Sequence, residues 1–190
     1  LQEIEGGPRS VRHTMSILTA MLYERFKAGG FPIALVSMDN CSKNGEKLFE
    51  SVFLIAEKWA EKGFVEKEFL DYLRDENAVA FPWTMIDKIT PNPAGEVQRI
   101  LEELGVEDMN ILETNGGSRI APFVNAEVTE YLVVEEKFPN GRPPLEKAGV
   151  IFTDRLTVER TEKMKVGTCL NPLHTALAIF GCLLGFRSIR

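Results

Sequence analysis

The sequence predicts an α/β fold, with a doubly wound parallel sheet first and helix after it. Apolar residues recur at helical spacing over residues 12–27, a continuous apolar run follows at 33–36, and helical spacing returns over 48–62. A helix, a strand and a helix in this order are typical of a parallel sheet with helices on its faces. The apolar run predicts a strand that is buried on both sides.

Turn residues divide the remainder of the chain. Gly29 and Gly30 end the first predicted helix, and Gly105 ends a later one. Pro172 predicts the start of a last helix, which is apolar nearly all round and which we therefore expect to be buried between other helices. The other predicted elements are helices over 64–73 and 95–104, strands over 78–81, 84–89, 131–134 and 150–152, and a turn over 115–117.

The composition is that of a folded globular protein. Of its 190 residues, 44% are hydrophobic and 26% are charged, with a net charge of −6. Lys and Arg are dispersed among acidic residues, so nucleic acid is not an expected partner. We find no uninterrupted apolar run of membrane-spanning length and no signal peptide at the start, so we expect no membrane partner and a cytoplasmic location.

Cysteine and histidine are too few for a metal site of the usual kind. Cys41, Cys169 and Cys182 are an odd number without CxxC spacing, which argues against a disulfide framework and a structural zinc site. His13 and His174 are the only histidines. We therefore expect no catalytic zinc.

An amine, an amide and an imidazole lie within ten residues, at Lys165, Asn171 and His174. A metal-free alcohol dehydrogenase needs these groups: a base for the hydroxyl proton, a donor to the developing alkoxide, and a group that orients the same oxygen. A lysine is a base at neutral pH when burial lowers its pKa from about 10.4 towards 7 or 8. Taken alone, such residues are more often a solvated lysine, a helix cap and a packed histidine.

Further motifs in the same order point to one family. They are Val-Ser-Met-Asp-Asn at 36–40, Lys-Asn-Gly at 43–45, Met-Ile-Asp-Lys-Ile-Thr-Pro at 85–91, Glu-Glu-Lys-Phe at 135–138 and Gly-Arg-Pro at 141–143. Glu162 stands three residues before Lys165. Over residues 3–186 the chain resembles the long-chain polyol and hexuronate dehydrogenases, the family of mannitol 2-dehydrogenase and fructuronate (mannonate) reductase.

The resemblance implies an NAD- or NADP-dependent oxidoreductase that needs no metal. It would interconvert a secondary alcohol of a sugar alcohol or sugar acid with its ketone. Lys165 would be the catalytic base, with Glu162 passing its proton to water. Asn40 and Asn171 would hold the substrate oxygen. His174 and Asp87 would help to orient the substrate or the cofactor. Asp87 and Asn40 would lie beside the cofactor.

Each of these residues also has a purely structural interpretation. Asn40 can cap the helix that follows it, and Asp87 can end a strand. Glu162 and Lys165 form an i, i+3 pair that on an exposed helix means nothing for function. His174, at the start of an apolar helix, can be a core histidine.

One spacing departs from the family. The family places four residues between the lysine and the asparagine, whereas five separate Lys165 from Asn171. On an undistorted helix one added residue turns everything after it by about 100°. If the chemistry is retained, the helix must therefore bulge, break or kink between Val166 and Pro172. Otherwise this branch has lost the chemistry.

No glycine-rich dinucleotide fingerprint follows a strand anywhere in the sequence. By the resemblance it would lie ahead of Leu1, so we interpret the chain as an internal fragment. Residues 1–155 would be a partial Rossmann-like NAD(P)-binding domain, and 156–190 the beginning of a helical domain. The competing interpretation is a catalytically inactive fragment or an oligomerisation scaffold. The choice of NAD or NADP, the particular substrate and the oligomeric state stay open.

Overall fold

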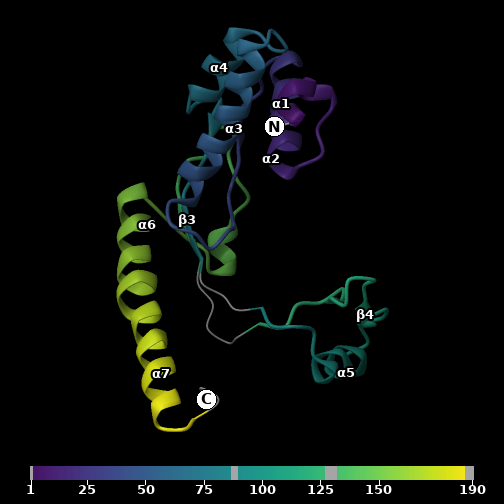
Figure 1. The fold of residues 1–190 in the computed structure, drawn as a ribbon, viewed down its shortest axis with the longest axis vertical. Helices are drawn as coiled ribbons and strands as arrows, with labels where there is room; N and C mark the ends of the chain where they lie inside the picture. Colours follow the sequence, from purple (N-terminus) through teal and green to yellow (C-terminus); the bar gives the residue numbers. More distant parts are fainter. Residues whose placement is uncertain (1, 87–89, 127–131, 187–190) are drawn as a thin grey trace. The chain divides into compact units, whose positions relative to one another are not determined.

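The computed structural model describes residues 2–86, 90–126 and 132–186, which form two compact units (Figure 1). The first unit comprises residues up to Ile86 together with those from Leu132 onward. The second comprises the intervening part of the sequence, Asp87–Tyr131. Both mix helix and strand, so the predicted α/β class is confirmed.

A cluster of helices begins the first unit. Its members are α1 (Gln2–Gly6), the 3-10 turn η1 (Gly7–Arg9), α2 (Thr14–Lys27), α3 (Asn44–Glu61) and α4 (Lys67–Arg74). Helices α2 and α3 pack against each other, as the upper part of Figure 1 shows. Trp59 and Phe69 are fully buried between these helices, where Phe69 packs edge-on against Tyr23. The apolar face of each predicted helix thus forms one aromatic core.

Two short parallel strands follow the prediction in place but not in length. Strand β1 (Ile33–Ala34) pairs with β2 (Val79–Ala80) in parallel register. The pairing is extended by one hydrogen bond, from the Leu35 amide to the Ala80 carbonyl at 2.8 Å. The predicted strands at 33–36 and 78–81 therefore have the right centres and too many residues.

The other sheet of this unit is mixed rather than wholly parallel. Strand β3 (Thr84–Ile86) is antiparallel to β6 (Leu132–Glu135), and β7 (Ile151–Thr153) is parallel to β6. A 3-10 turn, η2 (Leu145–Ala148), precedes β7. Val133 and Val134 of β6 are buried, so this central strand holds the sheet together.

The second unit contains α5 (Gly95–Glu103) and a hairpin of β4 (Leu112–Glu113) and β5 (Arg119–Ile120). The turn over residues 115–117 is as predicted, but its flanking strands were missed. They are two residues long and exposed, so no alternating apolar pattern marks them.

One continuous helical segment ends the described chain. It runs through α6 (Arg155–Glu162), the π-helix η3 (Lys163–Leu170) and α7 (Asn171–Leu183). The Asp154 carboxylate caps it, accepting a hydrogen bond of 2.9 Å from the Thr157 amide. The sequence predicted that Pro172 begins a new helix, but Pro172 is the second residue of α7, which continues the π-helix without a break. The π-helix ends just before it, and prolines and π turns are both known to distort helices.

Helix α7 also differs from its predicted surroundings, because none of its residues is buried against the described part of the chain. The segment 155–183 is long and apolar enough to cross a membrane by length and composition, with a mean hydropathy of 1.4 over one 18-residue window. The sequence contains no uninterrupted apolar run of that length, so we expected no such segment from it. Core helices of soluble proteins have the same composition.

Candidate functional site

Asn40 lies in the loop that leads from β1 to α3, where its side chain is exposed. The residue that precedes α3 is Lys43, in the left-handed region with φ of 54°, and no side chain caps the helix. Asn40 is therefore not the cap of α3, which removes its structural interpretation. The loop follows the carboxyl end of a parallel strand, where ligands bind in open α/β sheets.

Asn44, only 2% exposed, holds this loop from the protein interior. Its Nδ2 donates to the Asp39 carbonyl at 3.0 Å and to Thr84 Oγ1 at 2.7 Å, with the Ser37 carbonyl at 3.3 Å. In return, Asn44 Oδ1 accepts a hydrogen bond of 3.0 Å from the Thr84 amide. The Thr84 hydroxyl donates to the Ser37 carbonyl at 2.7 Å. The loop is thus joined on both sides of its bend to the first residue of β3.

Gly45 makes this junction possible. A Cβ at this position would lie 2.5 Å from the Phe81 carbonyl oxygen and 2.7 Å from Trp83 Cδ1. Real Cβ atoms do not approach backbone oxygens so closely, so only glycine brings the start of α3 against this segment. The Lys-Asn-Gly motif therefore combines a left-handed turn, a buried amide and a close approach.

Glu135 makes the corresponding connection to the long helix. The carboxylate, 7% exposed, accepts from the Trp83 amide at 3.0 Å and from Arg155 Nε at 3.0 and 3.1 Å. Arg155 also lies over the Trp83 ring, 5.4 Å from its centroid, and pairs with Glu76. Because Arg155 is the first residue of α6, this carboxylate fixes the start of the helix against β3.

The neighbouring Glu136 and Arg142 explain another predicted motif. Arg142 binds Glu136 through two hydrogen bonds of 2.8 and 2.6 Å, and Glu146 through one of 2.6 Å. Hydrogen bonds from Arg142 lower the pKa of both carboxyl groups. Arg142 also lies 3.4 Å from the centroid of the Phe152 ring. The motif therefore anchors the proline-rich loop to β7.

The π-helix occupies the stretch where the spacing predicted a departure from α-helical geometry. The Asn171 amide donates to the carbonyl of Val166, five residues back, and the Thr168 hydroxyl to that of Lys163 at 2.8 Å. From Lys165 to Asn171, six α-helical steps would amount to about 240°, against about 140° for the family's five. A π turn takes one residue more than an α turn, which restores about 140°.

The structure places four of the predicted residues on this one helix. Lys165 and Glu162 are half-buried, whereas Asn171 and His174 are exposed. Asn171 lies inside the helix and is no N-terminal cap, and His174 is no core histidine of the described chain. Asn40 comes from the separate loop after β1, and Asp87 lies outside the described residues.

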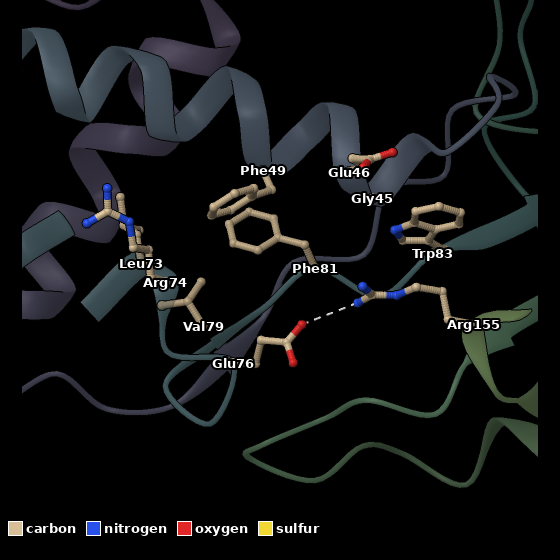
Figure 2. Close-up of a pocket in the computed structure, with 10 residues that line it drawn as sticks. All are labelled: Gly45, Glu46, Phe49, Leu73, Arg74, Glu76, Val79, Phe81, Trp83 and Arg155. Atoms are coloured by element: carbon tan, nitrogen blue, oxygen red, sulfur yellow. Dashed lines mark hydrogen bonds and ion pairs between the residues drawn. The ribbon is translucent and has the colours of Figure 1, made fainter. Parts of the chain in front are cut away.

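A cavity of about 310 Å³ lies elsewhere, beside the junction (Figure 2). Arg155 lines it next to Trp83, and its guanidinium forms the ion pair with Glu76 that the dashed line in Figure 2 marks. The predicted site residues are not among those that line it, which are Gly45, Glu46, Phe49, Leu73, Arg74, Glu76, Val79, Phe81, Trp83 and Arg155. This cavity is therefore not the candidate site.

The start of α3 does not form a phosphate cradle. A phosphate cradle needs a glycine whose missing Cβ makes room for the ligand. Gly45, at the start of α3, instead faces the protein's own backbone. The described residues contain no group of three or more His, Cys, Asp or Glu that could hold a metal.

Residues 1–147 match the family described as the mannitol dehydrogenase Rossmann domain. The chain belongs to the mannitol dehydrogenase family. Across its whole length it is 58% identical to a D-mannonate oxidoreductase of Thermotoga maritima, of which it covers 35%. It is 33% identical over 97% of its length to a mannitol 2-dehydrogenase of Phaeosphaeria nodorum, covering 29% of that protein.

A solved mannitol dehydrogenase structure has the same fold. The mannitol 2-dehydrogenase of Pseudomonas fluorescens, in ternary complex with NAD and D-mannitol, matches 98% of this chain with a TM-score of 0.66 and 31% identity. The match covers 33% of that enzyme. The chain thus spans about a third of the length of these relatives. The predicted family and Rossmann-type fold are confirmed.

Sequence reasoning overlooked the residues that support the site. Asn44 and Glu135 stood inside quoted motifs without a role, and Thr84 and Arg155 were not singled out. A signal was available for Thr84, a polar residue between the apolar Trp83 and Met85, since such a residue in a buried strand is expected to be hydrogen-bonded.

Proposed function

We propose that the encoded protein containing this chain is a cytoplasmic, NAD(P)-dependent and metal-independent oxidoreductase. It interconverts the secondary alcohol of an aldonate or polyol with its ketone, of the mannonate/fructuronate or mannitol/fructose type. The observation that carries the proposal is 58% identity over the whole chain to a D-mannonate oxidoreductase, against 33% to a mannitol 2-dehydrogenase. This difference favours a sugar acid as substrate.

In oxidation, a bound NAD(P)⁺ would supply the acceptor for the hydride that leaves the alcohol carbon. The Lys165 amine removes the hydroxyl proton as that hydride leaves, so the carbon–oxygen single bond becomes a carbonyl. Asn40 and Asn171 donate hydrogen bonds to the oxygen while it carries negative charge, which is worth most in a site that excludes water. Glu162, one helical turn before Lys165, passes the proton on to water.

The π-helix supports this assignment of roles. An extra residue in an α-helix would turn Asn171 and His174 away from Lys165, whereas the π turn returns them to the family's angular spacing. A helix that had lost its function would have no need to compensate for the insertion.

Substrate assays test the proposal. The encoded protein is incubated with D-mannonate or D-mannitol and either NAD⁺ or NADP⁺, and the formation of reduced cofactor is followed by its near-ultraviolet absorbance. We expect turnover with D-mannonate and a higher kcat/KM for it than for D-mannitol. Absence of turnover with both compounds, in a protein that binds cofactor, would favour the inactive scaffold.

A further inference from the structure

We infer that Asn44 and Thr84 are positioning residues that hold Asn40 at the substrate oxygen. This inference rests on the proposed function, because it assigns to the two residues an effect exerted through Asn40. Neither residue needs to touch substrate.

The hydrogen bonds around the loop carry the inference. Asn40 itself is exposed, so its placement depends on the backbone on either side of it. Two carbonyls of that backbone, from Ser37 and Asp39, are bound by the Asn44 amide and the Thr84 hydroxyl. The Cys41 amide closes the bend by donating to the Asp39 carbonyl at 2.9 Å. The bend that contains Asn40 is therefore held by Asn44 at the residue before Asn40 and is closed on itself by the residue after it.

Burial makes these bonds strong constraints. Asn44 is 2% exposed and Thr84 is 6% exposed, so water does not compete well for their polar groups. Loss of the Thr84 hydroxyl leaves the Ser37 carbonyl with the longer bond from Asn44 at 3.3 Å and removes the Thr84 acceptor of the buried Asn44 amide. A buried polar group that loses its partner costs about 1–3 kcal/mol, and movement of Asn44 and the loop bound to it relieves that cost. Thr84→Val therefore weakens the hold on the Asn40 loop.

The backbone at the start of β3 is also connected to the long helix. The amides of Trp83 and Thr84, consecutive in sequence, donate to Glu135 and Asn44 respectively. Glu135 holds the start of the helix that carries Lys165, and Asn44 holds the loop that carries Asn40. The two consecutive amides at the start of β3 thus hold both the Asn40 loop and the helix of Lys165. A displacement of about 1 Å between catalytic groups can cost on the order of 10² in rate.

Thr84→Val is the informative substitution, since it removes the hydroxyl and keeps the volume. The encoded protein is assayed with D-mannonate or D-mannitol, whichever of the two it turns over. We expect kcat to fall by about 10- to 100-fold, with a smaller change in KM. Thr84→Ser, which keeps the hydroxyl, should restore kcat to within about threefold of the original. Thr19→Val is the matched control, because Thr19 is also buried and its hydroxyl, among the described residues, donates to the Met15 carbonyl of its own helix.

A double-mutant cycle separates positioning from general damage. If Thr84 acts through Asn40, then Thr84→Val should change kcat by less than about twofold when Asn40→Ala is already present. An equal fold-change in both backgrounds would overturn the inference while leaving the proposed function intact. If Asn40→Ala alone costs less than about tenfold, the proposed role of Asn40 fails, and the inference fails with it.

Amide hydrogen exchange gives a readout that does not depend on turnover. In Thr84→Val the amides of residues 37–41 should exchange faster than in the original protein, while those of α2 stay unchanged. Thr19→Val should leave the loop unaffected. Unchanged exchange in the loop of a folded Thr84→Val protein would also overturn the inference.

Discussion

Glu135 and Arg155 join the mixed sheet to the long helix through two hydrogen bonds from one nitrogen, at 3.0 and 3.1 Å. The same carboxylate binds the Trp83 amide at 3.0 Å. The buried carboxylate of Glu135 in β6 thus binds both the first residue of α6 and the backbone just before β3. The position of the helix that carries Lys165 depends on this contact.

Glu135→Ala should destabilise the protein by about 2–4 kcal/mol, because it leaves the buried Trp83 amide without an acceptor and removes the partner of Arg155. The exposed part of Arg155 retains water, which keeps the cost below that of a fully buried pair. Urea unfolding followed by tryptophan fluorescence measures the change. Glu136→Gln, at the adjacent exposed pair, is the control and should cost less than about 1 kcal/mol. Equal effects of the two substitutions would contradict the structural role of Glu135.

Gly45→Ala should be destabilising by about 1–3 kcal/mol, since its Cβ would meet the Phe81 carbonyl at 2.5 Å and force the strand and helix apart. Gly95→Ala provides the comparison, because nothing lies within 4 Å of a Cβ there. We expect that control to be neutral or slightly stabilising. Thermal unfolding of both proteins checks the pair, and a Gly45→Ala protein as stable as the original would show that α3 does not approach residues 81–83 so closely.

Asp154 should make a pH-dependent contribution to stability. Hydrogen bonds from the Thr157 side chain and amide lower the pKa of its carboxyl below the ordinary value of 3.8. Its stabilising effect is therefore present in full above the unfolded pKa and is lost as the pH falls through the lower, folded value. Asp154→Ala should lower Tm at pH 7, and the difference in Tm from the original protein should shrink as the pH falls below about 4. A difference that stayed constant from pH 7 to pH 2 would argue against the cap.

Removal of Gly167 tests the π-helix. The deletion restores four residues between Lys165 and Asn171, so the segment should become α-helical and kcat should stay within about tenfold of the original. Insertion of one alanine after Gly167 should instead rotate Asn171 and His174 by about 100° and reduce kcat by more than about 10². Deletion as damaging as insertion would mean that the π turn does not compensate for the extra residue.

Local patterns predicted the elements but not the way they are joined. Helical periodicity located α2 and α3 because their apolar faces meet in one core. The extra residue after Lys165 indicated a bulge, a break or a kink if the chemistry is retained, and the structure has a π-helix there. The hairpin of β4 and β5 has no such periodicity. Pro172 misled the prediction, since the rule that prolines begin helices does not consider a π turn before them.

The support of the candidate site was beyond reach of local patterns for a related reason. Asn44 and Thr84 are 40 residues apart, and Glu135 and Trp83 are 52 apart. Contacts at such separation arise from the packing of α3 and β6 around β3, which composition and periodicity do not encode. The motifs named some of these residues without revealing what they bind.

The central claim is that Lys165 is the base of a mannitol-dehydrogenase-type reaction, and the kcat of Lys165→Ala in the encoded protein tests it most directly. Lys163→Ala is the matched control, an exposed lysine of the same helix that pairs with Glu159 at 2.7 Å. We expect Lys165→Ala to lose at least about 10² in kcat with its affinity for NADH nearly unchanged, and Lys163→Ala to stay within about twofold. A Lys165→Ala protein that kept more than about a tenth of the original kcat would contradict the assignment.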